Sequence, residues 1–280
     1  MTERWRLAGC AALIALLASG CGSVPATTRQ ALRIKGSDTM LILNQRLAEG
    51  FMREHPGVAV VVEGGGTSTG VEAIIGGEAS ICAASRPLAP AEVQRLHDRY
   101  GTLGVRHLIA RDALSVWVHP DNEVRSLSLD QLAAIFDGSA TRWSELGGAD
   151  LEIAVVVRPP SSGTFRFFRD RVLRGRAYTG RAVTAVSTSE VVRRVADDPS
   201  AVGYGGAAYL RDGVRACAIE GVLPSAVGVD GARYPLARHL VFYTAAPPEG
   251  LSKEFIDWCQ GSGGQAAVSE AGYLPLWTRP

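Results

Sequence analysis

Arg158-Pro-Pro-Ser-Ser-Gly-Thr164 joins an apolar, β-rich run that begins at Ile153 to a helical pattern in which Phe165, Phe168 and Val172 recur. An arginine offers a planar fork of donors that matches phosphate or carboxylate, and the serine and threonine hydroxyls add further donors. The free N–H groups and the dipole of a helix N-terminus also favour an anion. The segment therefore predicts a strand-turn-helix junction that cradles an oxyanion, although alone it also fits an ordinary turn with a solvated arginine.

Three further segments place similar residues after β-rich runs. They read Gly36-Ser-Asp-Thr-Met40, Gly64-Gly-Gly-Thr-Ser-Thr-Gly70 and Ser85-Arg86-Pro87. Each alone fits a glycine-rich turn or a helix cap. Because ligands of α/β sheets bind beyond the carboxyl ends of the strands, four such ends predict one shared binding site.

β-rich runs and helical patterns alternate along the chain. Helices are indicated by apolar residues at helical spacing from Met40 to Phe51 and from Val71 to Ile75, and by capping boxes at Ser128/Gln131 and Ser187/Glu190. Strands are expected at residues 32–35, 58–63, 80–84, 114–119, 153–158, 202–204 and 239–244. This alternation predicts an α/β fold built on mainly parallel strands.

The N-terminus has the order of a targeting segment. Arg4 and Arg6 precede an apolar run at 7–18, which is too short for a permanent membrane helix, and Leu17-Ala-Ser-Gly-Cys21 follows. That string looks like a bacterial lipoprotein signal, so we expect a signal peptide at 1–20, diacylation of Cys21 and a flexible tether at 21–29. The domain would then be anchored by lipid to a bacterial membrane, outside the cytoplasm. Plain secretion with Cys21 as a spare thiol is the competing interpretation.

Charge and cysteine content exclude several classes of function. The chain has 29 basic and 28 acidic residues, and loss of residues 1–20 leaves 27 of each, so no broad basic field for nucleic acid is expected. The histidines are scattered and no cysteines have metal-site spacing, so we predict no metal, and no cofactor is expected. Cys82, Cys217 and Cys259 would allow one disulfide in an oxidising compartment, but the pairing cannot be read from sequence.

One motif suggests an enzyme instead. Gly66-Thr-Ser-Thr-Gly70 matches G-x-S-x-G between a predicted strand and helix, which would make Ser68 a nucleophile and His239 its base. No HGG-type oxyanion segment precedes the serine, and a hydrolase gives no reason for the segment at 158–164. We therefore treat a serine hydrolase as the alternative.

Taken in order, the lipoprotein signal, the four polar segments and Ala201-Val-Gly-Tyr-Gly205 resemble the phosphate-binding subunit of bacterial phosphate ABC transporters, the PstS family. The resemblance covers essentially the whole mature chain. It implies a two-lobed periplasmic-binding-protein-like fold of type II, with two crossing hinge segments and a ligand cleft between the lobes. Lobe 1 would combine 30–112 with 237–280, lobe 2 would be 113–236, and the hinge would lie at 107–112 and 235–240.

The resemblance also implies a function and a set of contacts. The protein would bind inorganic phosphate and deliver it to ABC permease subunits, with no catalysis. The residues that match the family motif are, from lobe 1, Thr39, Thr67 and Ser85, and from lobe 2, Arg158, Ser162, Gly163 and Thr164. Neighbours of the anion would be Ser37, Asp38, Ser68 and Arg86.

The chain departs from part of the family at Ser85. Some members carry an aspartate there, and its carboxylate accepts a proton from phosphate and so rejects sulfate. Asp38 could supply an acceptor instead. Another tetrahedral oxyanion, and a sensor or adhesin role, therefore stay open beside phosphate transport.

Overall fold

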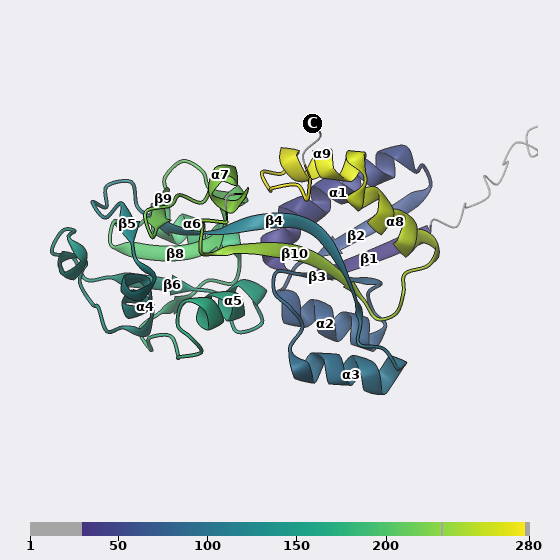
Figure 1. Ribbon diagram of the computed structural model, residues 1–280, viewed down its shortest axis with the longest axis horizontal. Coiled ribbons are helices and arrows are strands. Elements are labelled where there is room, and N and C mark those ends of the chain that lie inside the picture. Colours follow the sequence, from purple (N-terminus) through teal and green to yellow (C-terminus); the bar gives the residue numbers. More distant parts are fainter. Residues whose placement is uncertain (1–29, 231, 278–280) are drawn as a thin grey trace, which may run out of the picture.

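In the computed structural model, residues 30–230 and 232–277 form two lobes joined by strands β4 (Val105–Val118) and β10 (Ala237–Thr244) (Figure 1). The predicted signal peptide at 1–20, the lipidation site Cys21 and the tether at 21–29 lie outside the described residues. The two-lobed α/β architecture predicted from sequence is confirmed.

The first lobe is an α/β sandwich at the purple and yellow ends of the colour scale (Figure 1). Its parallel strands are β1 (Gln30–Gly36), β2 (Val58–Glu63) and β3 (Ile81–Ala84). Its helices are the 3-10 turn η1 (Asp38–Met40) and α1 (Leu41–Glu54), α2 (Thr67–Gly76), α3 (Pro90–Tyr100), α8 (Gly250–Gln260) and α9 (Ser262–Glu270). This lobe is thus built from two separate parts of the chain, one before and one after the second lobe.

The second lobe is formed by the middle of the chain (Figure 1). Its strands are β5 (Ser126–Leu127), β6 (Ala154–Val157), β7 (Val183–Thr184), β8 (Ala201–Gly206) and β9 (Arg215–Ile219). Its helices are α4 (Leu129–Asp137), α5 (Gly163–Arg171), α6 (Thr188–Ala196) and α7 (Ala226–Asp230), with 3-10 turns η2 (Trp143–Leu146) and η3 (Ala207–Tyr209).

One strand path runs through both lobes, in the order β2-β1-β3-β10-β4-β8-β6-β7. The first part of β4 pairs with β10, and its last part, from Leu114, pairs with β8 and β9. All antiparallel pairings among the described strands involve β4 or β10, and the other pairings are parallel. The prediction of mainly parallel strands therefore holds away from the two connecting strands.

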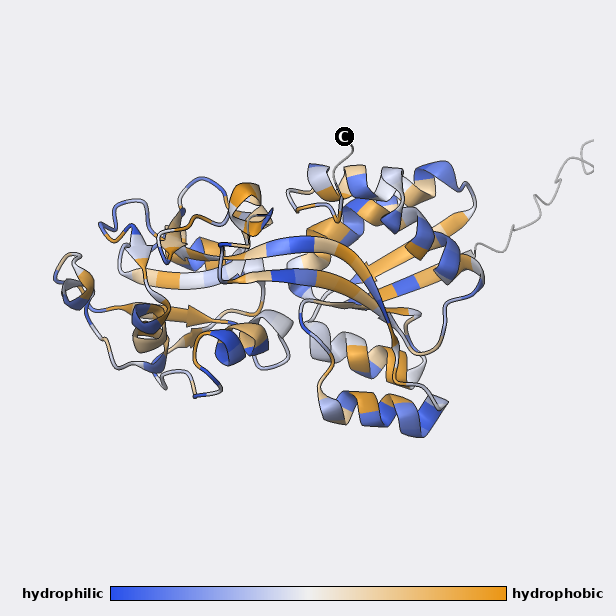
Figure 2. Ribbon diagram, in the orientation of Figure 1, coloured by the Kyte–Doolittle hydropathy of each residue, from blue (hydrophilic) through white to orange (hydrophobic). Residues whose placement is uncertain are grey.

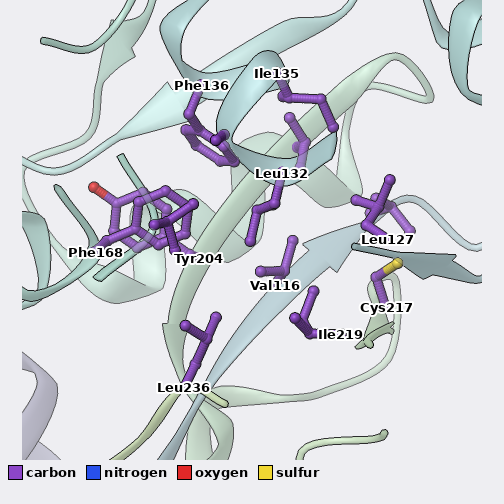
Figure 3. Close-up of a cluster of buried hydrophobic side chains, with 14 of the residues drawn as sticks. Val116, Leu127, Leu132, Ile135, Phe136, Phe168, Tyr204, Cys217, Ile219 and Leu236 are labelled. Atoms are coloured by element: carbon purple, nitrogen blue, oxygen red, sulfur yellow. The ribbon is translucent and has the colours of Figure 1, made fainter. Parts of the chain in front are cut away.

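Apolar side chains pack on the sheet of each lobe, and those of the second lobe fix the position of α5. In Figure 3, Phe136, Phe168 and Tyr204 lie together beside the strands. The rings of Phe168 and Tyr204 stack with centroids 4.2 Å apart, and that of Phe136 lies 4.6 Å from Phe168. Because Phe168 belongs to α5, this buried cluster anchors the helix whose N-terminus carries the predicted oxyanion segment.

The two connecting strands become hydrophilic where they cross between the lobes (Figure 2). There Arg111 and Asp112 of β4 lie opposite His239 and Arg238 of β10. The strand predicted at 114–119 is only the last part of β4, which begins at Val105. These charged residues obscure the apolar pattern of a strand, which is why the sequence did not show its full length.

The predicted capping boxes differ in detail. Ser128 Oγ accepts from the Gln131 N–H at the start of α4, and Gln131 Oε1 accepts from the Ser128 N–H, as expected. Ser187 caps α6 by accepting from the Glu190 N–H, but the Glu190 carboxylate accepts from the N–H of Val186. The second box is therefore only half formed.

Candidate functional site

The predicted site begins with a contact between two threonine hydroxyls of different lobes. Thr39 Oγ1, on η1 after β1, lies 2.7 Å from Thr164 Oγ1, in the first turn of α5, 125 residues away in sequence. Both side chains are buried. Two of the four strand ends, those after β1 and β6, thus meet as the sequence predicted.

The strand ends after β2 and β3 complete the group. The Ser85 N–H donates to Thr67 Oγ1 at 3.2 Å. A Cβ placed on Gly163 would lie 2.3 Å from Thr67 Oγ1 and 2.6 Å from Ser85 Oγ. Only a glycine therefore lets α5 approach these hydroxyls so closely. We call Thr39, Thr67, Ser85, Ser162, Gly163 and Thr164 the hydroxyl cluster.

The N-terminus of α5 adds backbone donors to the hydroxyl cluster. Ser162 is its N-cap, and Ser162 Oγ accepts from the Phe165 N–H at 3.3 Å. The first turn of a helix has N–H groups that no carbonyl of the same helix can accept, and Gly163 and Thr164 occupy that turn. The helix dipole adds partial positive charge there.

Arg158, which follows β6, is buried and held by several polar contacts. Its guanidinium donates to the carbonyls of Ala185 and Val186 at 3.2 and 3.1 Å and to Thr188 Oγ1 at 2.8 Å. It also forms an ion pair with Asp38 Oδ2 at 3.1 Å. Burial lowers the pKa of Arg158 from its usual value, and Asp38 opposes that shift. The ion pair of Arg158 with Asp38 therefore crosses the interface between the second and the first lobe.

Asp38 is tied to the second lobe by more than this ion pair. Asp38 Oδ2 accepts from the Thr188 N–H at 2.8 Å, and Tyr209 donates its hydroxyl to the Asp38 carbonyl at 2.9 Å. Ser37, its neighbour, is buried and donates its N–H to Ala83. Asp38 thus orients Arg158 and links the lobes.

Arg86 lies beside the site but is engaged elsewhere. Both of its terminal nitrogens donate to Glu92, at 2.7 Å each, and Nη2 also donates to Ser68 Oγ at 3.1 Å. Burial raises the pKa of Glu92, but its bonds to Arg86 and to the Ala89 N–H outweigh that effect and lower it. Arg86 and Ser68 are adjacent in sequence to Ser85 and Thr67 of the hydroxyl cluster. Their place beside an anion stays a prediction.

A third buried arginine, Arg238 on β10, was not predicted as a site residue. Its Nε and Nη2 donate to Asp112 Oδ2 at 2.9 and 2.8 Å, while Nη1 donates to Thr164 Oγ1 at 3.1 Å and to the Ser85 carbonyl at 3.3 Å. The sequence analysis assigned this segment only to the hinge. A charged residue two positions before the buried Leu240 was the available signal, since alternate residues of a strand share a face.

Comparison with known proteins identifies relatives of this chain. The model of the PBP superfamily domain matches residues 22–262. The phosphate-binding protein PstS of Bacillus subtilis is 36% identical over 88% of this chain and 80% of its own length. The chain belongs to the PstS family of the PBP superfamily. Its relative PstS from Pseudomonas aeruginosa is 29% identical over 86% of this chain and 81% of its own length.

Solved structures of similar proteins have the same fold. A phosphate ABC transporter substrate-binding protein from Clostridium perfringens, solved with bound phosphate, matches 89% of this chain and 100% of its own, with a TM-score of 0.82 and 28% identity. A phosphate transport receptor from Vibrio cholerae matches 88% of this chain and 100% of its own, with a TM-score of 0.73 and 27% identity. These PstS-like proteins are solute-binding proteins, not enzymes.

The hydrolase interpretation lacks its catalytic contact. Ser68 Oγ accepts a hydrogen bond from Arg86 Nη2, and no hydrogen bond among the described residues joins Ser68 to a histidine. A guanidinium donor cannot remove the proton of a serine. The surroundings of Ser68 therefore fit a ligand-binding site of the PstS family better than they fit a hydrolase with Ser68 as its nucleophile.

Metal-binding clusters and membrane-spanning helices are both absent from the described residues. Residues 30–230 and 232–277 contain no group of three or more His, Cys, Asp or Glu residues arranged to hold a metal ion. No helix in these ranges is both long and apolar enough to cross a bilayer. Cys82, Cys217 and Cys259 are buried free thiols, so the disulfide that an oxidising compartment would allow is not formed among them.

Proposed function

We propose that this protein binds inorganic phosphate between its lobes, outside the cytoplasm, and delivers it to the permease subunits of an ABC transporter. The observation that carries the proposal is the meeting of hydroxyls from both lobes, Thr39 with Thr164. The buried Arg158 pairs with Asp38, the residue before Thr39. Membership of the PstS family supports the same ligand and the same partner.

The anion would be held by direct contacts with the hydroxyl cluster and Arg158. Hydroxyls of Thr39, Thr67 and Ser85 would donate from the first lobe, and Ser162, Gly163, Thr164 and Arg158 from the second. Ser37, Asp38, Ser68 and Arg86 would lie around it. A hydrogen bond to a charged group contributes about 1.5–3 kcal/mol, so several together reach micromolar affinity or tighter after the ordering cost.

Phosphate binding would stabilise the contact between the lobes. An anion that bonds to Thr39 and Thr164 replaces their mutual hydrogen bond with two bonds of its own, and so favours the state in which the lobes meet. We propose lobes at 30–112 with 237–280 and at 113–236, with the hinge at 107–112 and 235–240. These segments lie in the paired parts of β4 and β10, or just before β10, and the same two strands join the lobes.

Selection of phosphate over sulfate would depend on Asp38. Asp38 Oδ2 accepts from Thr188 and pairs with Arg158, while no described residue donates a hydrogen bond to Asp38 Oδ1. That oxygen is available to accept the proton of hydrogen phosphate, which sulfate lacks. Ser85 cannot take this role when its hydroxyl donates to the anion.

We further propose that a lipid on Cys21 anchors the protein to the outer side of a bacterial membrane. The order of the N-terminal segment supports this placement, since its basic start, its apolar run and its small residues before Cys21 match a lipoprotein signal. The test is fractionation: Cys21→Ser moves the protein from the membrane to the soluble fraction if the cysteine carries the lipid.

The ligand is tested by calorimetric titration of the purified protein with phosphate, sulfate, arsenate and molybdate. The expected result is saturable binding of one phosphate per chain, with sulfate bound at least about tenfold more weakly, equivalent to about 1.4 kcal/mol. Tighter binding of sulfate or molybdate would replace phosphate as the ligand. Absence of binding for all four anions would contradict an oxyanion receptor.

A further inference from the structure

A separate cavity opens beside the hydroxyl cluster, where the connecting strands meet both lobes. Its volume is about 180 Å³. The lining residues come from the end of β3, from β4, from α5 and from β10, and they are Ser85, Arg86, Pro87, Arg106, Phe167, Arg238, His239, Val241 and Tyr243. The cavity therefore belongs to the interface between the lobes and not to the interior of either.

The cavity is distinct from the hydroxyl cluster but connected to it. Ser85 is the only residue of the cluster that lines the cavity. Arg238 forms the connection, because it lines the cavity and donates through Nη1 to Thr164 Oγ1. The guanidinium of Arg238 also lies 5.3 Å from the centre of the ring of Phe167, another residue that lines the cavity.

The charge of the cavity suits an anion. No carboxylate of the described residues lines the cavity. Two of its arginines are paired with carboxylates that do not line it, Arg86 with Glu92 and Arg238 with Asp112. The remaining cation is Arg106, which is exposed and has no carboxylate partner among the described residues. An anion in the cavity would therefore meet net positive charge.

The potential at the neighbouring His239 is consistent with this charge. Burial lowers the pKa of His239, and repulsion from Arg106 and Arg111 lowers it further. The cross-strand partner of His239 is Arg111, whose own charge is paired with Asp230. The imidazole can still donate a hydrogen bond from its neutral form.

Two lining residues also carry polar atoms that lack a partner. Ser85 Oγ and Arg86 Nε are buried, and neither makes a hydrogen bond with any described residue. Ser85 is fully buried, and Arg86 is 6% exposed. Buried polar groups are nearly always paired in folded proteins, so two unpaired atoms on lining residues indicate a missing partner in this region.

We propose that this cavity is an outer subsite that captures the oxyanion and passes it, by way of Arg238 and Ser85, to the hydroxyl cluster. The inference rests on the proposed function and adds a binding step to it. A concave surface with one sign of charge raises the local concentration of the oppositely charged ligand and hence the rate of association. We expect Arg106 and His239 to act on capture, because no hydrogen bond among the described residues joins either side chain to the hydroxyl cluster.

The test is stopped-flow fluorescence of phosphate association with the wild-type protein, with the double variant Arg106→Gln/His239→Gln and with Arg53→Gln. Arg53 is a matched control, an exposed arginine in the last turn of α1 that does not line the cavity. At low ionic strength the double variant is expected to associate about threefold more slowly or worse, with an unchanged dissociation rate. Its association rate should also depend less on salt.

Each outcome decides the inference. If the double variant associates as fast as the wild type, or slows only as much as Arg53→Gln, the proposal of an outer subsite is wrong, while the proposed function is unaffected. If it dissociates faster with an unchanged association rate, the two side chains belong to the final site, and capture is also wrong. If the wild-type protein binds neither phosphate nor any other oxyanion, the proposed function fails and the subsite fails with it.

Discussion

Thr39 Oγ1 and Thr164 Oγ1 lie 2.7 Å apart, and this hydrogen bond joins the two lobes at the point where the four polar strand ends meet. The two hydroxyls belong to different elements, η1 and α5, and both residues are buried. A contact of this kind forms only when the lobes come together. Under the proposed function, an anion that bonds to both hydroxyls would couple ligand affinity to the contact between the lobes.

Arg158→Ala should weaken phosphate binding at least about tenfold, equivalent to about 1.4 kcal/mol, because the anion then loses the buried guanidinium of Arg158. Isothermal titration calorimetry measures the change. Arg125→Ala, which removes an exposed arginine, is the control for lost positive charge. Equal affinity of Arg158→Ala and wild type would remove Arg158 from the site.

Gly163→Ala should prevent close approach of the lobes. Its methyl group would lie 2.3 Å from Thr67 Oγ1, so either α5 moves away or the hydroxyl is displaced. We expect a loss of phosphate affinity of about tenfold or more, with the stability of the fold little changed. Gly180→Ala is the control, since no atom lies within 4 Å of its added methyl group. Equal affinities of the two variants would show that the close approach is not required.

Arg238→Met should destabilise the protein by about 3–5 kcal/mol, because it leaves the buried Asp112 carboxylate without its cation. Urea unfolding measures this loss. The double variant Arg238→Met/Asp112→Asn should recover most of the stability, since no uncompensated charge remains. If the double variant is as unstable as Arg238→Met, the ion pair is not the reason for the loss.

Ser85→Asp should sharpen discrimination against sulfate. The new carboxylate would accept the proton of hydrogen phosphate but would face sulfate as an unpaired negative charge. Competition titrations should show the ratio of phosphate to sulfate affinity rising at least about tenfold. An unchanged ratio, in a variant that still binds phosphate, would mean that residue 85 does not contact the anion.

The sequence predicted the segments of the site better than it predicted the connections between them. Strand ends and helix starts carry local signals, so Arg158, Gly163 and Thr164 were identified from their own neighbourhood. Arg238 was missed because its role depends on Asp112, 126 positions earlier in the chain, across the ladder of β4 and β10. Such a pairing has no local signal.

The same distinction applies to the fold. The run at 58–63 coincides with β2, because its valines form an uninterrupted apolar pattern. The first half of β4 was missed, since its charged residues suggest a loop until β10 is seen beside it. The sequence did not predict the bidentate bond of Arg86 to Glu92, because this bond depends on how α3 packs after β3.

The most direct test of an oxyanion site at the meeting of the lobes is a crystal structure of the protein grown with phosphate. The account predicts a tetrahedral anion bonded to both Thr39 Oγ1 and Thr164 Oγ1, with Arg158 behind it and the two hydroxyls no longer in direct contact. A phosphate bound elsewhere, with the 2.7 Å bond between the threonines intact, would contradict it.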